Sequence, residues 1–202
     1  MNKVLKLLIA SDTFLWSGLG LIAPILAIYI KDYLPGGSLT VVGMASMIFL
    51  ITRVILQLIF SKIFTPKDRF WMVVVGTFCI ALVPFFYMIA RTVWHFYLAQ
   101  VIYGFGAGLA FPAWFSLFAS NLTKGQQGHE WAIYSAWVGI STGVAAFLGS
   151  WLANKISFNF VFLLAGCFAL AGMIILLRLQ KENLKKVMPH EMFVAKHKHL
   201  YK

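Results

Sequence analysis

The stretch Ala99-Gln100-Val-Ile-Tyr103-Gly104-Phe-Gly106-Ala-Gly108-Leu-Ala-Phe-Pro112 carries three glycines at every second residue and a proline within an apolar run. A second stretch near the N-terminus, Gly18-Leu-Gly20-Leu-Ile-Ala-Pro24, matches its last seven residues in Gly, Gly, Leu and Pro at an offset of 88 residues. Glycine and proline are common in transmembrane helices, so either stretch alone fits any such helix. Together the two stretches predict two related segments of a membrane protein.

The composition indicates an integral membrane protein. Hydrophobic residues make up 61% of the 202-residue chain and charged residues 11%. A soluble domain carries roughly 25% charged residues, so this chain lacks the side chains to cover a water-facing surface. The net charge of +11 can indicate nucleic-acid binding, but the hydropathy argues against that class. We therefore expect the lipid bilayer, and no nucleic acid, as a partner.

Six segments are long and apolar enough to span a bilayer, which takes roughly 20 residues. They cover residues 4–30, 39–60, 70–90, 93–119, 131–153 and 158–177. The predicted fold class is all-α integral membrane with six transmembrane helices. We expect a transmembrane domain at 1–178 and a basic cytoplasmic tail at 179–202.

The basic residues predict the orientation. With six spans both termini lie on one side, and thirteen Lys and Arg residues fall on that side against three on the other, Lys31, Arg91 and Lys155. Basic loops stay in the cytoplasm, so both termini are expected there. The predicted location is the cell (inner) membrane, with a multi-pass topology.

The two glycine-proline stretches fall in the first and fourth spans, which suggests a repeat of three spans. Repeat one would cover residues 1–90 and repeat two residues 91–178. Because three is an odd number, the two repeats must lie in opposite orientations. Inverted repeats of this kind are typical of secondary transporters.

At this point the sequence resembles one half of a major facilitator superfamily transporter. The run from Gln100 to Pro112 is similar to the family pattern Arg-x-x-x-Gly-x-Gly-x-Gly followed by Pro, with glutamine in place of the arginine. The fifth span resembles the family's glycine-rich pattern through Gly139, Gly143 and Gly149, although Ala145-Ala146 replaces the usual proline. The link after the second span, residues 61–69, resembles a degraded form of the family's Gly-x-x-x-Asp-Arg-x-Gly-Arg-Arg loop.

The resemblance implies a transporter that works by alternating access. The family normally has twelve spans in two parallel six-span halves, so a six-span chain would form a homodimer equivalent to one carrier. By this analogy spans one and four line the cavity, spans two and five form the dimer interface and spans three and six face lipid. The interface glycines would be Gly139, Gly143 and Gly149, which permit close helix approach. The alternative is that the chain is half of a hetero-paired transporter.

Two ionisable residues lie inside predicted spans, where such residues are costly and functional by default. Asp12 and Arg53 lie at similar depth from the cytoplasmic side, where they could pair. Burial favours the neutral form of Asp12 and Arg53 its charged form, as a proton-coupled carrier requires. The alternative is a static ion pair that holds the helices together.

Other residues are expected to line the cavity or to bend the helices. Gln100, Tyr103 and Trp16 are candidate cavity liners, and Trp16 shares a helix face with Asp12. An equally open reading makes Trp16 a lipid-facing or packing residue. The residues expected to act as helix hinges are Gly18, Gly20, Pro24, Gly104, Gly106, Gly108 and Pro112.

No catalytic residue, metal site or cofactor is predicted. The chain has no zinc-ligand spacing or nucleophile elbow, and its Gly-x-Gly-x-Gly lacks the preceding strand of a dinucleotide site. We expect Glu130 to form a solvated helix start and the tail to be flexible and to attract anionic lipid. The predicted function is secondary transport of small or amphipathic molecules, including proton-coupled efflux. The rival is a non-transporting membrane subunit or assembly factor that retains the fold.

Overall fold

The computed structural model describes residues 1–63 and 69–198, with side chains described as far as Leu179. Six long helices account for most of it: α1 (Lys3–Ile28), α2 (Leu39–Ile63), α3 (Arg69–Ile89), α4 (Val93–Asn121), α5 (Gln127–Lys155) and α6 (Phe158–Lys198). A π-helical turn, η1 (Tyr29–Tyr33), extends α1. All six helices are long and apolar enough to cross a membrane. The predicted all-α membrane fold is confirmed.

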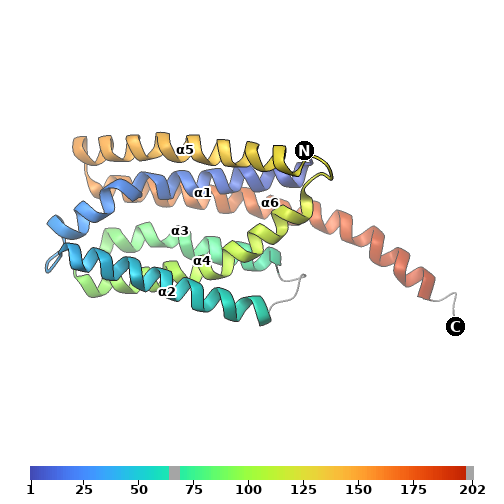
Figure 1. The fold of residues 1–202 in the computed structure, drawn as a ribbon, viewed down its shortest axis with the longest axis horizontal. Coiled ribbons are helices and arrows are strands. Elements are labelled where there is room, and N and C mark those ends of the chain that lie inside the picture. The colour runs from blue at the N-terminus through green and yellow to red at the C-terminus, as the bar shows by residue number, and fades with distance from the viewer. Residues whose placement is uncertain (64–68, 199–202) are drawn as a thin grey trace.

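The helix boundaries follow from capping and turn residues. Asn2 caps α1, because its side-chain oxygen accepts a hydrogen bond of 2.8 Å from the backbone nitrogen of Leu5. Gly36 and Gly125 lie in the links before α2 and α5 with φ values of 79° and 83°, a conformation that favours glycine. Figure 1 shows that α4 bends in its second half, the half that contains Pro112.

The sixth helix is longer than the sequence indicates. Its membrane-spanning part is Phe158–Leu179, but the helix continues past the bundle to Lys198 (Figure 1). The expectation of a flexible tail is therefore wrong for the backbone up to that residue. The side chains of the predicted tail, and residues 64–68 of the predicted family-like loop, lie outside the described part of the chain.

The helices form two rows of three (Figure 1). In one row α1 packs between α5 and α6, and in the other α4 packs between α2 and α3. The rows join where α3 packs on α6, whereas α2 and α5 scarcely touch each other. The packing of α3 on α6 therefore closes one edge of the space between the rows, and the edge between α2 and α5 is open.

Burial differs sharply among the helices. Within Leu39–Ile63, Ala45 is the one buried residue of α2, and α5 buries three residues, Glu130, Ala145 and Gly149. The inner faces of α1, α3 and α4 supply much of the apolar core, including Leu8, Ile80 and Phe118. Large apolar side chains instead cover the outside of α2 and α5. Such surfaces need lipid or another protein against them.

Candidate functional site

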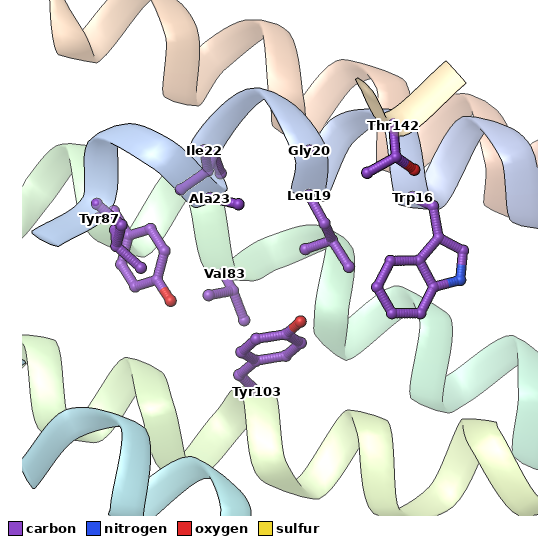
Figure 2. A pocket seen from close by; sticks show the side chains of 10 residues that line it. Trp16, Leu19, Gly20, Ile22, Ala23, Val83, Tyr87, Tyr103 and Thr142 are labelled. Atoms are coloured by element: carbon purple, nitrogen blue, oxygen red, sulfur yellow. The ribbon is translucent and has the colours of Figure 1, made fainter. Parts of the chain in front are cut away.

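A pocket of about 230 Å³ lies between the two rows (Figure 2). The α1 helix supplies most of its wall, α3 and α4 supply tyrosines, and α5 supplies one threonine. The lining residues are Trp16, Leu19, Gly20, Ile22, Ala23, Leu26, Val83, Tyr87, Tyr103 and Thr142. In Figure 2, Trp16 lies toward one end of the pocket and Tyr87 toward the other, with Tyr103 between them on the opposite wall. We call this space the inner pocket.

Asp12 lies beside the Trp16 end of the inner pocket. Its side chain is 6% exposed, and its carboxylate accepts a hydrogen bond of 2.7 Å from the Tyr134 hydroxyl of α5. The Trp16 side chain, one helical turn along α1, also interacts with this carboxylate. The Tyr134 hydroxyl thus gives the buried acid the hydrogen-bond partner that a buried polar group requires.

Arg53 is held by an aromatic ring instead of an acid. Its guanidinium carbon lies 4.7 Å from the ring centre of Phe111 on α4, a cation–π arrangement. Its Nε atom is buried without a hydrogen-bond partner among the described residues. The expected pairing with Asp12 is wrong within the described part of the chain, because α2 packs on α4 and α1 packs on α5 and α6.

Two aromatic rings nevertheless connect the two charges. Phe111, which lies under Arg53, stacks on Trp16 with ring centres 6.0 Å apart and planes 22° apart. Trp16 in turn interacts with Asp12, one helical turn away on α1. This series, Arg53–Phe111–Trp16–Asp12, is named here the aromatic bridge. It crosses from one row of helices to the other.

A neutral hydrogen-bonded pair, Gln100 and Tyr87, lies at the far end of the inner pocket from Asp12. Gln100 is 5% exposed, and its amide nitrogen donates a hydrogen bond of 2.8 Å to the Tyr87 hydroxyl of α3. Tyr87 stacks on Phe96, and its backbone carbonyl accepts a 3.3 Å bond from the Tyr29 hydroxyl. Gln100 thus lies behind the pocket wall, and its partner Tyr87 lines the pocket.

The pocket wall contains one orphaned polar atom. The Thr142 hydroxyl oxygen is buried without a hydrogen-bond partner among the described residues. Tyr103 lines the opposite wall, stacks on Phe49 at 4.1 Å between ring centres and interacts electrostatically with Arg53. A bound molecule with one hydrogen-bonding group and an apolar body would suit this wall.

The glycines of the two matching stretches lie at close helix contacts. A Cβ atom on Gly18 would lie 2.6 Å from the Ala165 carbonyl oxygen of α6, and one on Gly106 would lie 2.7 Å from the Gly76 carbonyl oxygen of α3. Gly20 faces α5 and Gly108 faces α2 in the same way. A Cβ atom on either glycine would lie 2.9 Å from a carbonyl oxygen of that neighbouring helix. Gly104 likewise meets Thr52 at 2.7 Å. These glycines let backbones approach closely.

The predicted interface glycines fall into two groups. A Cβ atom on Gly139 or Gly143 would meet no atom of the described residues within 4 Å, so this face of α5 is open there. Gly149 is different, because a side chain there would overlap the backbone of Leu21 on α1. An interface role for Gly149 between two chains is therefore wrong, since α1 of the same chain already covers it.

Glu130 is buried, with 1% exposure, so the expected solvated helix start is wrong for this residue. Its carboxylate accepts bonds of 2.7 and 2.9 Å from the backbone nitrogen and hydroxyl of Thr123, and the amino nitrogen of Met1 lies 3.3 Å away. These contacts hold the start of α5 against the end of α4 and the start of α1.

Sequence reasoning missed Tyr134, Tyr87, Phe111 and Thr142. A tyrosine within a spanning helix is a usable signal, because its hydroxyl needs a partner there. No such signal marks Phe111 among nineteen phenylalanines. Among the residues that the structure describes, no three His, Cys, Asp or Glu side chains group in a way that could hold a metal ion.

Comparison with known proteins agrees with this architecture. The sequence model of the Major Facilitator Superfamily matches residues 8–199 of the chain. No curated protein matches the chain.

Proposed function

The chain belongs to the Major Facilitator Superfamily, and from that premise we propose that it is half of a secondary active transporter for small amphipathic molecules. Members of this superfamily are membrane transporters and not enzymes. The observation that carries the proposal is the inner pocket, which lies between two rows of helices and has a buried acid beside one end. Two rows that separate and close around such a pocket would give alternating access.

The packing supports an inverted repeat of residues 1–90 and 91–178. The packing of α1 against α6 and α5 matches the packing of α4 against α3 and α2. The contact between α3 and α6 then pairs the third helix of each repeat. The glycines follow the same exchange, because Gly18 faces α6 where Gly106 faces α3, and Gly20 faces α5 where Gly108 faces α2. We infer that the glycine-proline helices α1 and α4 are equivalent members of the two repeats.

The exposed faces of α2 and α5 support pairing with a second six-helix half. Met47, Leu50 and Val54 of α2 and Ile140 and Val144 of α5 are at least 46% exposed. The inner pocket lies between rows that scarcely touch at these helices, so a second half placed there would complete its wall. We propose a parallel homodimer, since closed two-fold symmetry is the commonest homo-oligomer arrangement.

The basic residues support a cell (inner) membrane protein with both termini in the cytoplasm. In that orientation Asp12 and Arg53 lie in the cytoplasmic half of the bundle. The aromatic bridge would then cross between the rows on the cytoplasmic side of the inner pocket.

Proton coupling would act through Asp12. An ionised carboxylate only accepts hydrogen bonds, whereas the protonated acid also donates one. Proton uptake would therefore change how Asp12 bonds Tyr134 and how it interacts with Trp16, the ring that stacks on Phe111 of the other row. A proton at Asp12 would thus change the preference between an open and a closed arrangement of the rows.

The experiment uses the purified full chain in liposomes that contain a pH gradient and a panel of fluorescent aromatic dyes. We expect gradient-driven dye movement, reduced at least tenfold by Asp12→Asn. Asp32→Asn is the matched control, because Asp32 is half-exposed in η1 and pairs with Lys31. Equal transport by wild type and Asp12→Asn would remove Asp12 from the mechanism.

Cysteine crosslinking tests the homodimer separately. A chain carrying Met47→Cys and Ile140→Cys should form disulfide dimers in membranes, because α2 of one copy would lie near α5 of the other. The wild-type chain is the control, since its exposed Cys167 lies on α6, a helix expected to face lipid. A strict monomer would contradict the two-halves proposal.

The rival function is a non-transporting membrane subunit that retains the fold. Glutamine in place of the family's arginine at Gln100 favours this rival. Absence of transport for every dye, with a correctly folded dimer in the membrane, would support it.

A further inference from the structure

A second hollow lies on the opposite side of α1 from the inner pocket. It measures about 320 Å³, and we call it the outer groove. Helix α1 supplies one wall, and Trp137 of α5 supplies the other. The residues lining it include Lys6, Ile9, Ala10, Thr13, Phe14 and Trp137.

Helical spacing separates the two faces of α1. Lys6, Ala10 and Phe14 follow one another at four-residue intervals and line the outer groove. Asp12 and Trp16 share another face, which points toward the inner pocket and the aromatic bridge. The outer groove thus faces away from the second row of helices, and a molecule in it would not enter the inner pocket.

The depth of the outer groove matches one leaflet of a bilayer. From Lys6 to Phe14 the helix rises about 12 Å at about 1.5 Å per residue. The hydrocarbon core of a bilayer is about 30 Å thick, so one leaflet contributes about 15 Å. An apolar hollow of this length on a helix within the membrane suits a single acyl chain.

A cation lies at the end of the outer groove nearest the N-terminus of α1. Lys6 is exposed and makes no ion pair among the described residues. The nearby acids are engaged elsewhere, since Asp12 bonds Tyr134 and Glu130 bonds Thr123. A flexible lysine at this depth can reach the headgroup region with its ammonium group.

We propose that the outer groove binds an anionic phospholipid, with one acyl chain between α1 and α5 and the headgroup phosphate on Lys6. Basic residues beside helices at the membrane surface attract anionic lipids, and here Lys6 lies at the end of the apolar outer groove. The site is separate from the inner pocket, so it does not depend on the transport mechanism.

Native mass spectrometry of the detergent-purified full chain tests the site with two added lipids, phosphatidylglycerol and phosphatidylcholine. We expect more bound phosphatidylglycerol than phosphatidylcholine. Lys6→Gln should lower the phosphatidylglycerol affinity about fivefold, the effect of one lysine near a membrane surface. Lys31→Gln, in η1 beyond the other end of α1, is the matched control and should leave the phosphatidylglycerol affinity unchanged.

A second variant tests the apolar part. Ala10→Phe fills the outer groove and should lower phosphatidylglycerol binding while circular dichroism shows an unchanged helix content. A preference for phosphatidylglycerol that survives Lys6→Gln would place the headgroup on other basic residues and overturn the proposal. Binding that falls with Lys6→Gln but survives Ala10→Phe would show headgroup adsorption alone and would overturn the acyl-chain site.

Discussion

Asp12 and Gln100 lie 88 residues apart, at the same position in the two glycine-proline helices, and each bonds a tyrosine hydroxyl from a neighbouring helix. The roles of the tyrosines are reversed. Tyr134 donates to the Asp12 carboxylate, whereas Tyr87 accepts from the Gln100 amide. Because α1 and α4 run in opposite directions, the two pairs lie near opposite ends of the inner pocket.

The difference between the pairs is the ability to take up a proton. A carboxylic acid exchanges a proton, and a glutamine amide does not. Under the proposed mechanism, one end of the pocket therefore has a group that can change its protonation state, and the other end has a neutral hydrogen bond that cannot. The aromatic bridge starts at the Asp12 end and leads to Arg53 in the second row.

Exchanging the two polar groups should have the largest effect. The double variant Asp12→Gln with Gln100→Asp keeps one acid in the bundle but moves it away from Trp16. We expect gradient-driven dye transport to fall to the level of empty liposomes, because the acid no longer touches the aromatic bridge. Asp12→Glu is the control and should retain transport. Wild-type activity in the exchanged chain would show that the position of the acid is immaterial.

Alanine at the paired glycines should have the next largest effect. Gly18→Ala and Gly106→Ala each place a methyl group against a backbone carbonyl oxygen, and each should cost about 1–3 kcal/mol in the free energy of unfolding. Denaturant titration in detergent measures this loss. Gly139→Ala is the matched control, since it meets no neighbour and should leave stability unchanged or gain up to about 1 kcal/mol. Equal effects at all three sites would contradict the close-packing role.

Removing the tyrosine hydroxyls measures how much the Asp12 pair and the Gln100 pair each contribute to stability. Tyr134→Phe takes a donor from a buried carboxylate and should cost about 2 kcal/mol, whereas Tyr87→Phe takes an acceptor from a neutral amide and should cost about 1 kcal/mol. The same titration compares them. A larger loss for Tyr87→Phe would show that the neutral pair is the stronger contact.

The smallest expected effect concerns Thr142. Thr142→Val keeps the shape and removes the unpartnered hydroxyl, so the free energy of unfolding should change by less than about 1 kcal/mol or rise slightly. Dyes with a hydrogen-bonding group should bind the variant more weakly than wild type, and dyes without one should bind equally. Fluorescence titration of the purified chain measures both. Equal losses for the two kinds of dye would indicate a change of pocket shape instead.

The fold was largely predictable from the chain. The lengths of the apolar segments predicted all six helices, because a bilayer sets a minimum span length. The main errors were at helix ends, where α5 begins at Gln127 and α6 continues to Lys198. Polar residues in those regions suggested links or a tail, but the structure describes helical backbone there.

The candidate site was predictable only in part. Asp12 and Trp16 were expected together, because four-residue spacing places them on one helix face. Their partner Tyr134 lies 122 residues from Asp12, and Phe111 comes from the other row. The expected ion pair failed for the same reason, since consecutive helices in the chain need not be packing neighbours.

From the chain alone it follows that this is a membrane protein with six spanning helices, with the same glycine-proline pattern in two of them and two charges inside its spans. Those features are local, because they depend on segment length, apolar content and residue spacing. Only the tertiary structure decided which helices pack together. That packing separates Asp12 from Arg53, places two rings between them, and turns Gly149 inward while Gly139 and Gly143 stay open. Close packing between distant segments carries no local signal in the chain, so it appears only when the helices are assembled.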